Sequence, residues 1–183
     1  METARRLVSL KPDIARIYPA LVIKNTYMED MFLRGEYKPL TVDEAARISK
    51  KLLIIFEGSG VNVIRIGLQP TENIEKDKDV VAGPFHPSMR QLVESLVYRD
   101  MLELLLDKTE PGEKEFTVKV NPVNVSELIG NRKSNLNYIK ERFSLDKLFI
   151  VQDKSEDKDT LVLIDGEKRT IMSKKHYYSI STK

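Results

Sequence analysis

The stretch DIARIYPALVIKNTYMEDMFLRGEYKPL, from Asp13 to Leu40, decides the fold of this chain. Residues 14–23 are nearly all apolar, with Pro19 near the middle, a pattern that predicts a strand covered on both faces. The apolar run ends in the polar cluster 24–26, at the carboxyl end of the strand, where α/β barrels and open sheets bind ligands. An ordinary strand exit is the alternative interpretation.

The residues that follow predict a helix and a second strand. Tyr27–Arg34 is typical of a short helix closed by Gly35, and TVDE at 41–44 has the spacing of a capping box. Apolar residues at helical spacing then lead to a second strand at 61–69. The order strand, helix, strand predicts a right-handed parallel crossover.

Polar side chains alternate with apolar ones along both predicted strands. Arg16 and Tyr18 share one side of the first strand, and Arg65 and Gln69 share one side of the second. We expect these four side chains, together with Lys24, to converge on a pocket at the carboxyl ends of the strands.

Four strings carry a resemblance to a known family: RIYPALVIKNT, GEYKPLTVDEA, VIRIGLQPTE and VVAGPFHPSMR, the last at 80–90. They resemble the last strands and helices of the radical SAM barrel, in the branch of the elongator catalytic subunit and the clostridial oxygen-independent coproporphyrinogen oxidase-like proteins. The resemblance covers about residues 2–106. It implies an α/β fold for residues 1–107, part of a TIM-type barrel.

The resemblance also implies cofactors for the complete enzyme, namely S-adenosylmethionine and a [4Fe-4S] cluster. The family holds its cluster with three cysteines in Cys-x-x-x-Cys-x-x-Cys order, and this chain has no cysteine. We therefore expect no cofactor or metal site in the chain alone, and a role for the five polar residues in cofactor binding only in a complete barrel. Something should cover the open sheet, which is a missing N-terminal radical SAM half, a second copy of the chain, or a rearrangement of the chain itself.

Composition bounds the class of protein. A chain of 183 residues with 41% hydrophobic content can fold as one or two domains. The 30 basic and 28 acidic residues nearly cancel, so any affinity for nucleic acid must be local. The first ten residues resemble neither a signal peptide nor a membrane span, which predicts a cytoplasmic protein without membrane contact.

His86 is the one histidine in the first predicted domain. It lies in an irregular segment that contains Gly83, Pro84 and Pro87, just before a long predicted helix at 88–107. It is a candidate for a polar or proton-transfer role at the mouth of the barrel. A capping or packing role is the alternative.

The segment KTEPGEK at 108–114 predicts a linker, and beyond it the hydrophobic period changes. Residues 116–120 alternate as in a half-exposed antiparallel strand. Two helices at 125–129 and 134–143 and two strands at 148–151 and 160–164 follow. Residues 115–183 should therefore form a small α+β domain.

The string LIGNRKSNLNYIKERF resembles the helix, loop and helix of K homology RNA-binding domains, whose Gly-x-x-Gly loop clamps a nucleic-acid backbone. Gly130 matches the first glycine, Asn131 and Arg132 match the middle pair, and Lys133 replaces the second glycine. We expect these four residues and Asn135 to bind RNA, because a turn before a helix offers amides and positive charge to phosphate. A helix hairpin with a solvated turn and a helix-turn-helix DNA reader are the alternatives.

The tail from Gly166 carries five Lys or Arg against one Glu. His176, Tyr177 and Tyr178 are interleaved with these basic residues, so the tail could hold a single strand by charge and stacking. A terminal strand or helix with a solvated face is the alternative.

Two functions remain open at this point. The chain is either the C-terminal, substrate-binding portion of a radical SAM enzyme that modifies RNA, with tRNA as the expected substrate, or a stand-alone module that binds RNA or a protein. In the first case the chain is not catalytic by itself, because a three-cysteine cluster cannot form on it.

Overall fold

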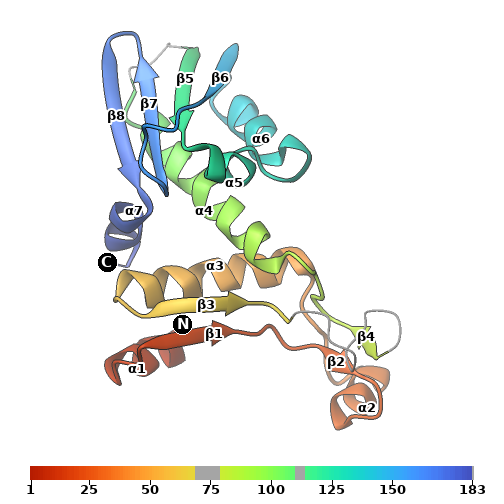
Figure 1. Ribbon diagram of the computed structural model, residues 1–183. Coiled ribbons are helices and arrows are strands. Elements are labelled where there is room, and N and C mark those ends of the chain that lie inside the picture. The colour runs from red at the N-terminus through yellow and green to blue at the C-terminus, as the bar shows by residue number, and fades with distance from the viewer. Residues whose placement is uncertain (69–78, 110–113, 183) are drawn as a thin grey trace. The chain divides into compact units, whose positions relative to one another are not determined.

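The computed structural model describes residues 1–68, 79–109 and 114–182 of the chain (Figure 1). The chain forms two compact units, Met1–Val93 and Glu94–Lys183, and the division falls inside the helix α4 (Met89–Leu106). Most of α4 therefore belongs to the second unit, whereas the predicted linker at 108–114 follows this helix. Residues 110–113 of that linker lie outside the described residues.

The first unit contains three helices, the start of α4 and two small sheets among its described residues. The elements before α4 are α1 (Glu2–Ser9), β1 (Ile14–Ile17), β2 (Val22–Ile23), α2 (Tyr27–Leu33), α3 (Val42–Gly58), β3 (Asn62–Ile66) and β4 (Val80–Ala82). Strands β1 and β3 pair in parallel, and β2 and β4 pair antiparallel. The described residues form no closed barrel.

The parallel crossover β1, α3, β3 confirms the predicted order of strand, helix and strand. Helix α3 begins with the predicted capping box: Thr41 Oγ1 accepts from the amide of Glu44 at 3.2 Å, and Glu44 Oε2 accepts from the amide of Thr41 at 2.8 Å. The helix packs against both strands, and its side chain of Leu53 is fully buried. The capping box fixes where the covering helix begins, and therefore which of its residues reach the sheet.

The prediction of one continuous buried strand at 14–23 is wrong. The segment divides into β1 and β2, which belong to two different sheets, and residues 18–21 between them form no strand. Pro19 lies in this interruption, where its missing N–H cannot join a ladder. Nor is β1 covered on both faces, because Ile17 is buried whereas Ile14 is half exposed.

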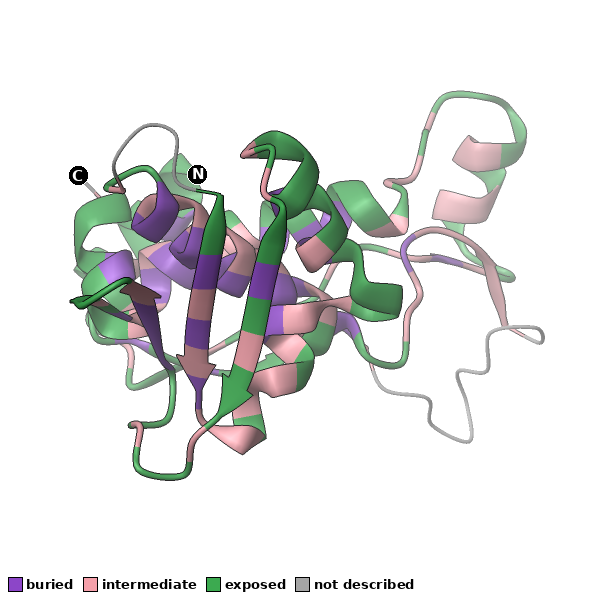
Figure 2. Ribbon diagram, turned by 90° about the horizontal axis from the view of Figure 1, so that it is seen from above, coloured by how far each residue is buried: buried purple, intermediate pink, exposed green. Residues whose placement is uncertain are grey.

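The second unit is built on one mixed sheet of four strands. After α4 it contains β5 (Glu115–Val120), η1 (Pro122–Asn124), α5 (Val125–Ile129), η2 (Asn131–Lys133), α6 (Ser134–Arg142), β6 (Lys147–Gln152), β7 (Thr160–Asp165), β8 (Lys168–Ser173) and α7 (Lys174–Ser181). The strand order is β6, β5, β7, β8, with β5 parallel to β6 and antiparallel to β7. Burial alternates along β5, as Figure 2 shows by its colours. The two helices and three strands expected between residues 116 and 164 are thus present.

A partly buried ion cluster ties α7 to the rest of the second unit. Lys174, the first residue of α7, has its Nζ 3.0 Å from Glu94 Oε2 on α4 and 3.4 Å from Asp159 Oδ1 before β7. The hydroxyl of Tyr98 donates to the same Asp159 oxygen at 3.2 Å. Burial by itself lowers the pKa of Lys174, but the carboxylates of Glu94 and Asp159 raise that pKa above its ordinary value of 10.5.

Replacing Lys174 tests this cluster. We expect Lys174→Met to lower the free energy of unfolding by about 3 kcal/mol, because it removes the cation that faces the buried Glu94 carboxylate. The raised pKa also predicts how this stabilisation depends on pH. The contribution of Lys174 to the free energy of unfolding is complete below pH 10.5 and disappears as the pH rises through the folded-state pKa. Urea unfolding at pH 7 measures the change, and Lys175→Met, at the exposed neighbour, is the control. Equal stability of the two variants would contradict a role for the cluster.

Candidate functional site

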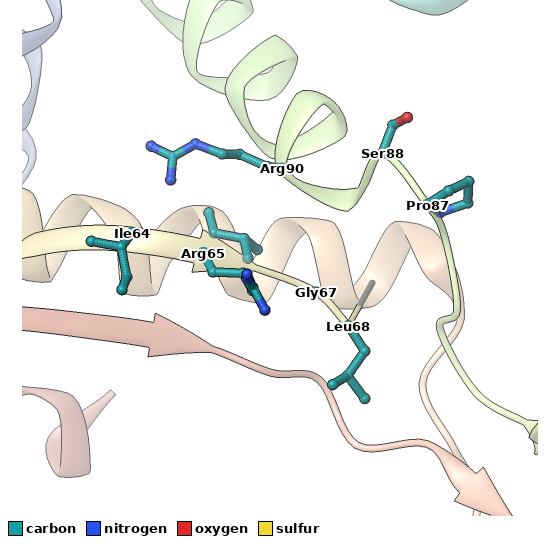
Figure 3. Close-up of a pocket in the computed structure, with 8 residues that line it drawn as sticks. Ile64, Arg65, Gly67, Leu68, Pro87, Ser88 and Arg90 are labelled. Atoms are coloured by element: carbon teal, nitrogen blue, oxygen red, sulfur yellow. The ribbon is translucent and has the colours of Figure 1, made fainter. Parts of the chain in front are cut away.

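A pocket of about 220 Å³ lies at the carboxyl end of β3 (Figure 3). One wall is the end of β3 and the residues just after it, and the other is the turn that leads into α4. The lining residues are Ile64, Arg65, Ile66, Gly67, Leu68, Pro87, Ser88 and Arg90. Its position agrees with the expectation that a site forms where a parallel strand ends.

An irregularity in the β1–β3 ladder places two arginines side by side. Ala15 pairs with Val63, but Arg16 pairs with Arg65, so Ile64 is an extra residue in β3. A bulge of this kind turns the following side chains onto the other face of the strand. It therefore moves Arg65 next to Arg16, where regular pairing would have placed Ile64.

The bulge also corrects the predicted alternation along the second strand. The alternation predicts Ile64 and Ile66 on the same side, but Ile64 is 42% exposed whereas Ile66 is 5% exposed. The exposed pair formed by Ile64 and Arg65 interrupts the period of two. A bulge leaves no mark in the hydrophobic pattern, so the sequence could not show it.

Of the other three predicted pocket residues, Tyr18 and Lys24 are not among the residues that line this pocket. Tyr18 follows β1 and is 43% exposed, while Lys24 follows β2 and donates its backbone amide to the Asp79 carbonyl at 2.9 Å. Gln69 lies outside the described residues. Arg16 and Arg65 are thus the two predicted pocket residues that the described structure brings together.

Arg90 lines the pocket although the sequence patterns do not single it out. Its Nη1 donates to the carbonyl of Val63 at 2.6 Å, and its Nη2 lies 4.0 Å from Glu57 Oε1. Figure 3 shows the side chains of Arg90 and Arg65 pointing in different directions. Arg90 therefore links α4 to β3 and α3, and its place at the end of the string VVAGPFHPSMR is the signal that could have identified it.

His86 adopts a local capping geometry. Its Nδ1 accepts a hydrogen bond from the backbone amide of Ser88 at 3.1 Å, and its carbonyl accepts from the amide of Met89 at 3.2 Å. These bonds organise the turn that precedes α4. The observed contacts favour the capping interpretation of His86, while its proton-transfer role stays a prediction.

The predicted loop in the second unit is an exposed turn with unusual backbone angles. Arg132 and Lys133 both have left-handed backbone, with φ of 49° and 63°. Gly130 has φ of 74°, and a Cβ there would approach Ser134 Oγ to 2.6 Å. The turn therefore requires glycine at 130 and displays Asn131, Arg132 and Lys133 to solvent.

Asn135 differs from the other predicted loop residues because it is only 3% exposed. Its Nδ2 lies within hydrogen-bond distance of the carbonyls of Glu127 and Leu128, at 3.1 and 3.2 Å, and of the Ser95 carbonyl at 2.8 Å. The amide thus satisfies carbonyls at the end of α5 and joins α6 to α4. It is not available to RNA in this structure, contrary to its predicted role.

The aromatic residues of the tail are also buried. Tyr177 and Tyr178 are each 4% exposed, and the Tyr177 hydroxyl donates to Asp100 Oδ2 at 2.7 Å. Burial, together with the Asp100 carboxylate, raises the pKa of Tyr177. The tail forms β8 and α7, so the alternative of a terminal strand and helix is confirmed and stacking of these tyrosines on bases is wrong.

The described residues offer no group of three metal-ligating side chains, and the sequence contains no cysteine. The ligands of an iron–sulfur cluster are cysteine thiolates, so the residues of this chain do not fit such a cluster. Within the described residues no helix is both long and apolar enough to cross a membrane.

Comparison with known proteins finds a family match in the region around the pocket. Residues 12–99 match the family described as "Radical_SAM C-terminal domain". The match includes β1, α3, β3, the pocket residues and the start of α4, and covers slightly less than half of the chain. It supports the resemblance to radical SAM proteins that the four strings carried, whereas the K homology resemblance is not confirmed.

Two curated proteins of Methanocaldococcus jannaschii are similar over short segments. One is named tRNA uridine(34) acetyltransferase and is 53% identical over 38 residues, which is 21% of this chain and 7% of that protein. The other is named an uncharacterized protein and is 45% identical over 49 residues, which is 27% of this chain and 15% of that protein. The matched segments span only a small part of either relative. No solved structure matches the chain significantly.

Gly67 closes the pocket against α4 and provides a test of its geometry. A Cβ at Gly67 would lie 2.6 Å from Met89 Cβ, whereas a Cβ at Gly60 meets nothing within 4 Å, and both glycines have φ near +80°. We expect Gly60→Ala to cost about 1 kcal/mol of stability from backbone strain, and Gly67→Ala about 3 kcal/mol because overpacking is added. Thermal unfolding of both variants measures the difference. Equal costs would mean that α4 does not pack against Gly67 in solution.

Proposed function

We propose that this chain is the C-terminal, substrate-binding portion of a radical SAM enzyme that modifies RNA, and that it is not catalytic alone. The observation that carries the proposal is the match of residues 12–99 to the radical SAM C-terminal domain, which coincides with the parallel pair β1–β3 and its pocket. The 53% identity to a protein named tRNA uridine(34) acetyltransferase supports a tRNA as the class of substrate.

The open face and edges of the β1–β3 pair indicate the structural role that we propose for the first unit. Helix α3 covers one face, while Ile14 and Ile64 remain 53% and 42% exposed. A two-stranded sheet needs further strands, a packed helix or another chain for its stability, and α3 covers only one face of this pair. In our proposal those strands come from the cluster-bearing part of the enzyme, which supplies the cysteines that this chain lacks.

The complete enzyme would use S-adenosylmethionine and a [4Fe-4S] cluster, as radical SAM proteins do. The cluster would supply the radical chemistry, and the cysteines that hold it would lie outside this chain. In the completed pocket Arg16, Tyr18, Lys24, Arg65 and Gln69 contact S-adenosylmethionine or the substrate. The chain thus contributes binding and orientation.

The second unit is proposed to hold the RNA. The turn Gly130–Lys133 presents two cations beside the amino end of α6, and neither Arg132 nor Lys133 has an ion-pair partner among the described residues. A stand-alone RNA-binding or protein-interaction module remains the alternative function. The family match does not favour it, because that match lies mostly in the first unit and ends at residue 99, before the loop.

Association with the cluster-bearing part tests the central proposal. We expect the chain, coexpressed with a radical SAM segment that carries the three-cysteine motif from the same genome, to copurify with it, because the β1 edge and its apolar neighbours become covered. Ile14→Lys should weaken this association at least about tenfold by placing a charge in the contact. Val123→Lys, at a residue 59% exposed in the second unit, is the matched control.

Copurification can be measured by size-exclusion chromatography with light scattering, first on the chain alone and then on the mixture. Self-association of the chain alone would assign the same surface to a second copy. A chain that stays strictly monomeric and does not bind the cluster-bearing segment would refute the proposal.

Binding of single-stranded RNA by the loop is a separate prediction. Arg132→Asn together with Lys133→Asn removes both charges and keeps residues that tolerate left-handed backbone. We expect weaker binding and a salt slope reduced by about 0.7 for each phosphate that is no longer neutralised. Lys154→Asn with Lys158→Asn removes two exposed charges elsewhere in the second unit and is the control. Equal RNA titrations for the two double variants at several salt concentrations would show that the loop is not the clamp.

A further inference from the structure

The structure places two cations next to each other on the open face of the β1–β3 pair. Arg16 and Arg65 are directly paired in the ladder, and both are exposed. Neighbouring strands lie about 4.8 Å apart, so paired side chains stand within contact reach of one another. Like charges in this position repel each other, and within the described residues no carboxylate pairs with either guanidinium.

We propose that Arg16 and Arg65 together form a binding site for a phosphate group. This inference rests on the proposed function and deepens it, since it names the chemical group by which the substrate is held in the first unit. The bulge carries the argument, because it brings Arg65 rather than Ile64 beside Arg16. Bulges are rare between parallel strands and frequent next to binding sites, where they redirect a side chain.

The chemistry of two adjacent guanidinium groups selects phosphate over carboxylate. Each guanidinium presents a planar fork of N–H donors that matches two oxygens, so one arginine satisfies the two oxygens of a carboxylate. Two forks match an anion with three or four oxygens and a charge of up to −2, and arginine stays protonated at every physiological pH. A phosphate bound between the forks also removes the repulsion between them.

The surroundings of the pair leave room for such a group. Ile17 and Ile66, the next pair in the ladder, are each 5% exposed, so the packed side of the sheet is occupied and the arginines stand on the other side. Gly67 follows without a side chain and lines the same pocket as Arg65. Arg90 adds positive charge nearby, but its guanidinium is engaged with Val63 and Glu57 and is not a ligand in our proposal.

Titration of the full chain with inorganic phosphate tests the site. We follow the arginine side-chain N–H resonances by NMR in a low-salt buffer without other oxyanions. We expect the signals of Arg16 and Arg65 to shift together, Arg16→Gln and Arg65→Gln each to weaken binding about tenfold, and the double variant to lose it. Arg5→Gln, an exposed arginine on α1, is the matched control. Unchanged phosphate affinity in the double variant would overturn the proposal.

The source of the phosphate is settled by two further ligands, adenosine 5′-monophosphate and a short single-stranded RNA. The RNA titration uses the chain that also carries Arg132→Asn and Lys133→Asn, so that the loop does not contribute. Weaker RNA binding in the Arg16/Arg65 double variant assigns the site to a backbone phosphate, and an effect on the monophosphate alone assigns it to a nucleotide. No effect on either ligand overturns the site.

The same variants separate this inference from the proposed function. The double variant, tested for copurification with the cluster-bearing segment, should associate as the unmodified chain does. Phosphate binding without association would refute the proposed function and keep the site, and association without phosphate binding would refute the site alone.

Discussion

The parallel pairing of β1 with β3 is the constraint on which the first unit depends. A parallel pair requires a crossover, and α3 provides it while burying Ile17, Val63 and Ile66 on one side of the sheet. On the other side of the sheet Ile14, Arg16 and Arg65 are exposed. The adjacent arginines and the exposed isoleucine thus lie on the face of the sheet that α3 does not cover.

In the second unit, the long helix α4 is held by polar contacts as well as by apolar ones. Asn135 joins α6 to Ser95, Tyr177 bonds to Asp100, and Lys174 lies beside Glu94. All three contacts reach α4 from elements that follow it in the chain. Residues that looked like an RNA-binding tail and loop in the sequence are therefore partly used to fix this helix.

Prediction from the sequence succeeded where the cause was local and failed where distant residues decide the outcome. The capping box at Thr41 and the alternation along β5 depend on neighbours within a few residues, and both are present. The bulge at Ile64 depends on the pairing of β3 with β1, which the run of side chains itself does not show. The break at Pro19 is an exception, because its cause, a missing N–H, is local and visible in the sequence. Tyr177 looks solvent-directed by type, but a carboxylate from another element provides its hydrogen bond and allows its burial.

Although the composition is nearly neutral, some cations lie beside an acidic residue, whereas others lie beside a second cation. Lys119 lies 3.1 Å from Asp153, Lys147 lies 2.6 Å from Glu115 and Arg169 lies 2.8 Å from Glu156, so much of the sheet surface is locally neutral. The pairs Arg16 with Arg65 and Arg132 with Lys133 differ, because each places two cations together. Since exposed charges are screened within about 8 Å at physiological salt, such adjacency sets the local potential more strongly than the net charge does. In both of our binding proposals, an anionic ligand binds at a position that backbone geometry selects, which is a bulge in one unit and a left-handed turn in the other.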